Sequence, residues 1–228
     1  MSKLYNLLNQ YYGEKSPWLE VEAVLRTEGK PEGMEDFYDP FKNLIIGILS
    51  QNTSDKNSTR AYLGLIKKFE IKPEELAKVP ENEIRKCIKT GGLYRIKAKR
   101  IKKLAKFILE EFNGDLIKIT KLPKNEARKI LISFPGIGQK TADVFLAYCM
   151  EEAVIPIDTN INRVVKRIGL VKENAGYEEI QKVLKKIFLK KQRVRAHELL
   201  IRLGRDFCKA RNPRCSQCPI AFLCKRKI

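Results

Sequence analysis

The sequence predicts an all-α protein. Apolar residues recur at three- and four-residue spacing along most of the chain, whereas few stretches alternate with a period of two. Short breaks that contain proline, glycine or asparagine separate the periodic stretches, as expected for helices joined by tight turns. We therefore expect about nine to eleven short helices. The clearest of them cover residues 43–51, 59–69, 84–90, 97–112, 126–134, 141–149, 160–170, 177–189 and 195–208.

Two stretches interrupt this pattern. Residues 29–40 are the least periodic part of the chain and are expected to link an N-terminal helix to the first core helix. Residues 151–158, EEAVIPID, separate two helical runs and indicate a domain boundary near residues 150–156. A chain of 228 residues is long enough for one or two small domains with a hydrophobic core.

The composition is that of a folded intracellular protein. Hydrophobic residues make up 43% of the chain, which excludes a disordered basic tail. The first eighteen residues are polar and aromatic, so no secretion signal is expected. No stretch approaches the roughly 20 apolar residues needed to cross a bilayer. We expect a cytoplasmic location, where thiols stay reduced and clustered cysteines bind metal more often than they form disulfides.

The chain is strongly basic. Its 46 lysines and arginines outnumber 27 acidic residues, which gives a formal net charge of +19. The charged surface of a thermophile would mix both signs, whereas this excess favours a polyanionic partner. Nucleic acid is preferred over an anionic membrane or a role in solubility alone, although charge by itself gives affinity without specificity.

Residues 122–149, LPKNEARKILISFPGIGQKTADVFLAYC, predict two helices joined by a tight turn. The first helix opens at Pro123 and stops before Pro135, and the second begins just after the two glycines of the turn. These glycines, Gly136 and Gly138, let the chain turn tightly and expose its N–H groups. Such donors at a helix N-terminus can hold a phosphate without reading a base, although an ordinary turn between helices has the same pattern.

Lys140 follows this turn as the second residue of the helix. A cation at the positive end of a helix opposes the macrodipole, so this is a poor place for a stabilising lysine. The same field disfavours the ammonium form, and a neutral amine is a nucleophile that can form a Schiff base. The alternatives are an ordinary surface lysine and a phosphate contact.

Asp158 stands where another predicted helix begins, after the apolar residues Ile155, Pro156 and Ile157. One interpretation is a helix N-cap. The other is a carboxylate held near Lys140, which would stabilise positive charge developing at a sugar carbon and manage protons.

Four cysteines lie near the C-terminus with the spacing C-x6-C-x2-C-x5-C: Cys208, Cys215, Cys218 and Cys224. Four thiolates from one compact loop can enclose a 4Fe–4S cluster. Zinc more typically uses two close pairs, and here only Cys215 and Cys218 form a C-x2-C pair. Disulfides are disfavoured in a reducing compartment.

Taken together, these motifs resemble the endonuclease III branch of the helix-hairpin-helix DNA glycosylases. The segment FPGIGQKTADVFL resembles the family's hairpin, with Lys140 at the position of the Schiff-base lysine of bifunctional members. IPIDTNINRV resembles the segment of the catalytic aspartate and places it at Asp158, eighteen residues further on. GGLYRIKAKRI resembles the segment before the hairpin, and the four-cysteine spacing resembles the iron–sulfur loop. The resemblance extends from about residue 40 to the end of the chain.

The resemblance implies two helical domains. Residues 38–152 would form a six-helix domain that contains the helix-hairpin-helix at about 123–149. Residues 1–37 and 153–228 would form an iron–sulfur cluster domain with its 4Fe–4S cluster in the loop 208–224. DNA would lie across a basic groove between the domains, with the two catalytic residues at its mouth.

It also implies a bifunctional DNA glycosylase and abasic-site lyase of base excision repair. Lys140 would displace the damaged base from an extruded nucleotide, Asp158 would assist, and the resulting imine would permit β-elimination that cuts the strand. Oxidised pyrimidines are the expected substrates, with mismatched thymine or uracil as the alternative. A non-catalytic DNA-binding or redox-sensing iron–sulfur module is more remote, because such a module needs neither catalytic residue.

Further residues are expected to touch DNA. Relatives carry a glutamine in the segment ILSQNTSDKN that fills the hole left by the extruded base, and both Asn52 and Gln51 are candidates for that role; a polar helix C-terminus is the alternative. Lys209, Arg211 and Arg214 lie among the cysteines and could grip phosphates once a cluster fixes the loop. The expected partner is double-stranded DNA with a damaged base or an abasic site, bound by a monomer at the nucleoid.

Overall fold

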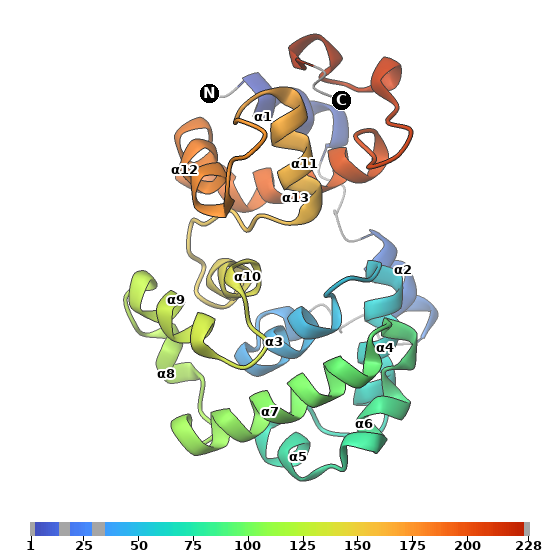
Figure 1. Cartoon of the computed structure of the whole chain (residues 1–228), viewed down its shortest axis with the longest axis vertical. Coiled ribbons are helices and arrows are strands. Elements are labelled where there is room, and N and C mark those ends of the chain that lie inside the picture. The colour runs from blue at the N-terminus through green and yellow to red at the C-terminus, as the bar shows by residue number, and fades with distance from the viewer. Residues whose placement is uncertain (1–2, 14–18, 29–34, 226–228) are drawn as a thin grey trace. The chain divides into compact units, whose positions relative to one another are not determined.

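The computed structural model describes residues 3–13, 19–28 and 35–225, and within these ranges every regular element is a helix (Figure 1). The described ranges contain thirteen α-helices, joined by turns and brief 3₁₀ segments, and no strand. The predicted all-α fold class is confirmed, with more helices than the sequence pattern indicated. None of the described helices is long and apolar enough to span a membrane.

Internal contacts divide the chain into two units, which we call the hairpin unit (residues 18–152) and the cysteine unit (residues 1–17 and 153–228). The helices of the hairpin unit are α2 (Leu19–Thr27), α3 (Pro40–Leu49), α4 (Asp55–Ile66), α5 (Pro73–Lys78), α6 (Glu81–Cys87), α7 (Tyr94–Phe112), α8 (Ile117–Thr120), α9 (Lys124–Ser133) and α10 (Gln139–Cys149). Those of the cysteine unit are α1 (Lys3–Tyr12), α11 (Thr159–Ile168), α12 (Tyr177–Ile187) and α13 (Arg193–Asp206).

Helix α3 is the buried centre of the hairpin unit. The Asp39 side chain caps it by accepting the Lys42 N–H at 2.8 Å, and Pro40 occupies the first turn, where no intrahelical N–H bond is lost. Helices α4, α7 and α10 pack against α3. Four of its apolar side chains are therefore fully buried, namely Leu44, Ile45, Ile48 and Leu49.

Helix α7 separates a buried face from a cationic one. Its apolar residues pack toward α3, α5 and α6, and lysines lie exposed on the opposite face. The helix begins after Leu93, which has φ +47°, and ends at Asn113, which has φ +53°. Its fully buried apolar residues are Ala98, Ile101, Leu104, Ala105 and Ile108.

The hairpin formed by α9 and α10 is held from two sides. At the end of α9, the ring of Phe134 packs against those of Phe107 and Phe112, with centroids 5.3 Å apart in each pair. At the start of α10, Gly47 of α3 permits a close approach, because a Cβ at Gly47 would lie 2.5 Å from Cγ2 of Thr141. The hairpin turn therefore has a fixed position within its unit.

Helices α11 and α13 form the core of the cysteine unit. They approach closely at Gly204, where a Cβ would lie 2.7 Å from the Cβ of Asn160. Helix α1 packs on α13. The fully buried apolar residues of this core include Ile161, Val164, Val165, Leu199 and Leu200.

The observed units differ from the expected domains at the N-terminus. The break after Glu152 falls where the sequence indicated one, but α2, which we expected in the cluster domain, packs on α4. This contact buries a small apolar group, Val21, Val24, Leu25 and Leu63. Residues 29–34 of the expected linker lie outside the described residues.

Candidate active site and cysteine loop

The connection between α9 and α10 is a type II β-turn. The Ile137 N–H donates to the Phe134 carbonyl at 3.1 Å, proline occupies the second position, and Gly136 occupies the third with φ +82°. A Cβ at Gly136 would also lie 3.0–3.3 Å from the Arg100 side chain, so glycine is favoured by both conformation and space. Gly138 differs, because its φ is not positive and a Cβ there would meet nothing within 4 Å.

Lys140 lies in the first turn of α10, as the sequence predicted. The helix begins after Gly138, whose carbonyl accepts the Ala142 N–H at 2.9 Å, and no side chain caps it. The positive end of the helix dipole therefore lies beside Lys140, which is half-exposed.

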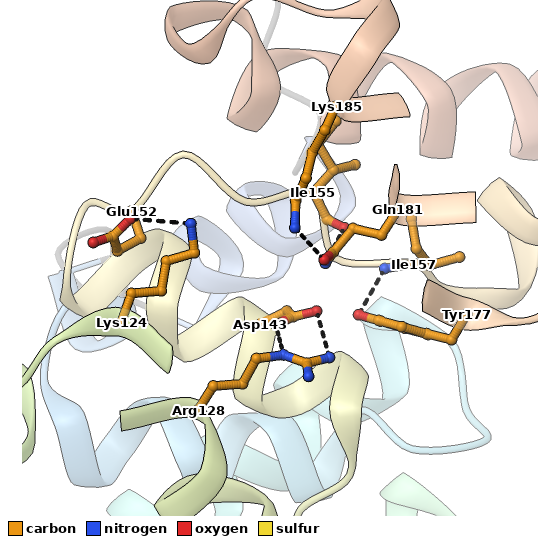
Figure 2. Close-up of polar contacts among 9 residues, drawn as sticks. All are labelled: Lys124, Arg128, Asp143, Glu152, Ile155, Ile157, Tyr177, Gln181 and Lys185. Atoms are coloured by element: carbon orange, nitrogen blue, oxygen red, sulfur yellow. Dashed lines mark hydrogen bonds and ion pairs between the residues drawn. The ribbon is translucent and has the colours of Figure 1, made fainter. Parts of the chain in front are cut away.

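A buried ion pair braces the two helices of the hairpin (Figure 2). Nε of Arg128 in α9 donates to Oδ1 of Asp143 in α10 at 2.7 Å, and the Asp143 side chain is fully buried. Lys124 pairs with Glu152 at 3.4 Å, which joins the start of α9 to the segment after α10. Because removing one member of a buried pair leaves an uncompensated charge, the Arg128–Asp143 contact fixes the hairpin geometry.

Gln51 and Asn52 follow α3 and lie in different surroundings. Nε2 of Gln51 donates to the Gly136 carbonyl at 3.0 Å, and its Oε1 accepts from the Arg100 guanidinium. Asn52 is exposed and has φ +52°, a left-handed conformation that asparagine tolerates better than most residues. The structure therefore ties Gln51 to the hairpin turn and leaves Asn52 at the surface beside it.

Two residues near this loop were not predicted from the sequence. The ammonium of Lys97, which is buried, donates to the carbonyls of Leu49 and Gly91 at 2.7 Å each, so the loop before α7 lies beside the end of α3. Burial, helped by the nearby Arg100 charge, lowers the pKa of Lys97 from 10.5 to about 8. The second residue is Leu93, an apolar side chain that is 50% exposed in a left-handed backbone conformation.

Asp158 is the N-cap of α11. Its Oδ1 accepts the Ile161 N–H at 2.7 Å, and its Oδ2 accepts from Nδ2 of Asn160 at 2.8 Å. The N-cap interpretation therefore holds. The two bonds also fix the orientation of a carboxylate that remains half-exposed, and a fixed carboxylate is what an electrostatic role in catalysis requires.

Side chains of α12 anchor the segment that precedes Asp158 (Figure 2). The Tyr177 hydroxyl accepts the Ile157 N–H at 3.2 Å, and Nε2 of Gln181 donates to the Ile155 carbonyl at 3.3 Å. Both isoleucines are buried, so backbone and side chains together hold Asp158 at the helix start.

A chain of hydrogen bonds joins Asp158 to the cysteine loop. Oδ1 of Asn160, the residue that donates to Asp158, accepts from a terminal nitrogen of Arg163 at 2.7 Å. Nε of Arg163 donates to the Cys208 carbonyl at 2.7 Å, and the same guanidinium reaches the Gly204 carbonyl at 3.0 Å. Arg163 thus holds Asn160 in position relative to the first cysteine of the loop.

The four cysteines of the loop 208–224 are half-exposed thiols that form no disulfide with one another. Arg167 of α11 lies over the first of them, donating to the Lys209 carbonyl at 2.7 Å and contacting Sγ of Cys208 at 3.8 Å. Burial, with a further contribution from the other three cysteines, raises the pKa of Cys218. Four cysteine thiolates from one loop are the donor set of a 4Fe–4S cluster, so the residues present fit this group.

The cationic side chains of this loop are accessible. Arg211 and Arg214 are exposed, and Lys209 is half-exposed, so all three can meet a polyanion. These residues and Asp158 belong to the cysteine unit, whereas Lys140 belongs to the hairpin unit. The pairing of the two catalytic candidates therefore stays a prediction.

Known proteins share this fold and these motifs. Residues 45–190 match the family model of the HhH-GPD superfamily of base excision DNA repair proteins, and residues 208–224 match the iron–sulfur binding domain of endonuclease III. Endonuclease III of Bacillus subtilis (strain 168) is 35% identical over 187 residues, which are 82% of this chain and 81% of that protein. A solved structure of a trapped endonuclease III–DNA covalent intermediate is 33% identical with a TM-score of 0.73, and the match covers 82% of this chain and 84% of that one. A thermostable thymine-DNA glycosylase is 25% identical with a TM-score of 0.71, over 83% of this chain and 84% of that one.

The chain therefore belongs to the HhH-GPD superfamily of base excision DNA repair proteins, and within it to the endonuclease III-like glycosylases with an iron–sulfur loop. It is a DNA glycosylase with abasic-site lyase activity, and its cofactor is a 4Fe–4S cluster. The function class and cofactor predicted from the sequence are confirmed.

Proposed function

We propose that the enzyme excises oxidised pyrimidines from duplex DNA and cuts the strand through a Schiff base on Lys140. The observation that carries this assignment is Lys140 itself, half-exposed in the first turn of the helix that follows the hairpin. The trapped covalent intermediate of the endonuclease III relative supports a covalent mechanism in this family.

In the proposed reaction Lys140 is the nucleophile. Its neutral Nζ attacks C1′ of the extruded nucleotide, and the C1′–N bond breaks as the base leaves with the bonding electrons and takes up a proton. Loss of the amine proton and opening of the sugar ring give an imine. Removal of a C2′ proton then breaks the C3′–O bond, which cuts the strand by β-elimination.

Asp158 supports this chemistry electrostatically. Its carboxylate stabilises the positive charge that develops on the sugar as the base leaves, and it can accept a proton in later steps. The hydrogen bonds from the Ile161 N–H and Asn160 hold it in one orientation, so little reorganisation is needed during the reaction.

Loops in each of the two units are proposed to contact DNA. Backbone N–H groups of the hairpin turn hold a phosphate, Asn52 fills the gap left by the extruded base, and Leu93 acts as an apolar wedge between base steps. The cations of the cysteine loop neutralise further phosphates. The residues assigned to these contacts are Asn52, Leu93, Gly136, Gly138, Lys209, Arg211 and Arg214. We expect a monomer that acts on damaged or abasic duplex DNA in the cytoplasm, at the nucleoid.

The proposed ligands of the 4Fe–4S cluster are Cys208, Cys215, Cys218 and Cys224. When bound, the cluster supplies a redox-capable iron–sulfur centre, and its ligation closes a loop that has little hydrophobic core of its own. Arg167 already binds the carbonyls of Lys209 and Ala210 at the start of this loop, at 2.7 and 3.2 Å. The main role of the loop is therefore structural, with a cationic surface toward DNA.

Borohydride trapping tests the nucleophile. Reduction of the imine during turnover should yield a covalent protein–DNA adduct with the wild type and none with Lys140→Ala, which should still bind DNA because the hairpin turn is intact. Lys129→Ala is a matched control, since Lys129 is an exposed lysine on α9 of the same hairpin. Trapping by Lys140→Ala would assign the nucleophile to another amine.

A panel of duplexes, each with one defined lesion, tests the substrate. We expect base release and strand cutting with thymine glycol. Mismatched thymine or uracil is the second candidate, because the thermostable thymine-DNA glycosylase matches this chain almost as well in structure as endonuclease III does, with TM-scores of 0.71 and 0.73. If the enzyme releases bases only from mismatched duplexes, its substrate is mismatched thymine or uracil and not an oxidised pyrimidine.

A further inference from the structure

We propose that Gln51 and Arg100 are positioning residues that lock the α3–α4 loop to the hairpin turn, so that Asn52 and not Gln51 enters the DNA. This proposal rests on the proposed function, because it assumes a duplex with a gap that a side chain can fill. It goes further by giving Gln51 a role within the protein and by adding Arg100, an α7 residue, to the DNA-engaging machinery.

Arg100 contacts both segments at once. Its aliphatic stem packs under Gly136, where a Cβ would lie 3.0 Å from Cδ, 3.1 Å from Cγ and 3.3 Å from Cβ of Arg100. Its guanidinium donates to Oε1 of Gln51. A guanidinium has only donors, so the carboxamide oxygen of Gln51 must face Arg100 and the carboxamide nitrogen must face away from it. That nitrogen donates to the Gly136 carbonyl at 3.0 Å, which completes a closed contact among the three residues.

These contacts fix the peptide group between Gly136 and Ile137 at both ends. Gln51 holds its carbonyl, and the Phe134 carbonyl accepts its N–H at 3.1 Å. The turn proposed to present N–H groups to a phosphate is thereby joined to the loop that carries Asn52. A movement of either segment on DNA binding would have to include the other.

The same contacts separate the two candidates for the gap. Gln51 could enter DNA only by leaving the Arg100 guanidinium and the Gly136 carbonyl without their partner, and each lost hydrogen bond is unfavourable. Asn52 is exposed one residue further on, in a left-handed backbone conformation. The Asn52 side chain can therefore enter the DNA while the hydrogen bonds of Gln51 to Arg100 and Gly136 stay intact.

The test uses the cluster-loaded protein and a duplex with a non-cleavable tetrahydrofuran abasic site opposite 2-aminopurine. Fluorescence of 2-aminopurine reports unstacking at the gap, and titration gives the affinity. Neither readout requires attack by a lysine, so failure of borohydride trapping and failure of this proposal are distinguishable. Melting temperatures of all variants, measured without DNA, separate positioning from loss of folding.

We expect Gln51→Ala to weaken binding of this duplex roughly five- to tenfold, the loss associated with about one hydrogen bond, with a small change in melting temperature. Asn52→Ala should abolish most of the 2-aminopurine signal at saturation. Gln51→Ala alone should reduce that signal only in part, because Asn52 is still present to enter the gap. If Asn52→Ala keeps the signal and Gln51→Ala loses it, Gln51 itself enters the DNA and the proposal is overturned.

Arg100→Met keeps the aliphatic stem and removes the guanidinium. It should weaken binding as Gln51→Ala does, and combining the two changes should add little to either. Lys103→Met is the matched control, because it removes one cation from the exposed face of the same helix. If Arg100→Met and Gln51→Ala weaken binding no more than Lys103→Met does, the contact between Arg100 and Gln51 does not position the loop of Asn52, and the proposal is wrong.

Discussion

Lys97 places a cation on the buried face of α7, among residues that are otherwise apolar. Its position is explained by two carbonyls that need donors. One belongs to Leu49, at the C-terminal and negative end of the α3 dipole, and the other to Gly91 in the loop before α7. A single residue therefore connects the loops that carry Asn52 and Leu93, at the cost of a pKa lowered to about 8.

This residue predicts a pH dependence of stability. Between the folded pKa of about 8 and the ordinary value of 10.5, the unfolded chain binds more protons at Lys97 than the folded chain. The free energy of unfolding should therefore rise with pH in this window, and the penalty of the buried charge is fully present only below it. Relative to Lys97→Met, which does not titrate, the wild type should gain about 1.5 kcal/mol between pH 8 and pH 9.5.

Urea unfolding of both proteins at several pH values, followed by circular dichroism, measures this difference. Subtracting the unfolding free energy of the variant from that of the wild type at each pH removes the contributions of other titrating lysines. Several of these lysines have raised pKa values. A difference that stays constant across the window would show that Lys97 titrates alike in the folded and unfolded chains.

At the scale of elements, the position of the hairpin depends on close packing between α3 and α10. Gly47→Ala would bring a methyl group to 2.5 Å from Cγ2 of Thr141, which is buried and β-branched and has little freedom to move. We expect a loss of about 1–3 kcal/mol in unfolding free energy, as is usual for overpacking. Thr141→Ser removes the clashing methyl group and should restore most of the loss when combined with Gly47→Ala. Denaturant unfolding of the single and double variants measures the rescue, and a double variant no more stable than Gly47→Ala would place the strain elsewhere.

The sequence pattern was sufficient for elements with a sustained apolar period. It predicted the hairpin helices and the helix that begins after Asp158, because these combine three- and four-residue spacing with local start and stop signals. Helix α5 was interpreted as a break because its six residues are too few to show a period. Its N-terminal signature was nevertheless present, with Pro73 in the first turn followed by two glutamates.

The residues of the candidate site likewise separate into those that a local sequence pattern predicts and those that it does not. Lys140, the Asp158 cap and the four thiols could be predicted from the sequence, because each follows from a local motif. The proposed choice of Asn52 over Gln51 could not be predicted in this way, since it depends on a hydrogen bond from Gln51 to Gly136, 85 residues further along the chain. Lys97 had a usable signal, because it shares a helical face with the apolar residues of α7, but the abundance of lysines obscured it.

At the scale of the whole molecule, α11 connects the Asp158 carboxylate at its start to the cysteine loop, which it contacts from its middle and from its end. Asp158 caps the N-terminus, and Arg163 reaches the Cys208 carbonyl from the middle of the helix. At the C-terminus the Lys225 N–H donates to the Ile168 carbonyl at 3.2 Å, so the residue after the last cysteine is held by the same helix. Loss of the cluster should therefore disturb the carboxylate through α11, even though a cluster of this kind needs no direct part in the reaction.

Two substitutions test the proposed chemical role of Asp158 separately from the contacts that hold it in place. Asp158→Asn keeps a side-chain oxygen for the Ile161 N–H, because asparagine caps helices as well as aspartate does, but it removes the charge and one of two acceptors. We expect base release in single turnover to slow by roughly 10²-fold or more, with iron content unchanged and stability lowered by about 1 kcal/mol. If turnover of the folded protein is unchanged and only the melting temperature falls, Asp158 is a cap and nothing more.

Arg163→Met removes the hydrogen bonds to Asn160, Gly204 and Cys208 while preserving much of the aliphatic stem. It should lower both iron retention and the rate of base release, because the loop and the carboxylate lose the residue that joins them. Iron per chain and single-turnover rate are measured on the same preparation, with rates expressed per iron-loaded molecule. A per-cluster rate equal to that of the wild type would mean that Arg163 serves the loop alone and that Asp158 is positioned by its own helix.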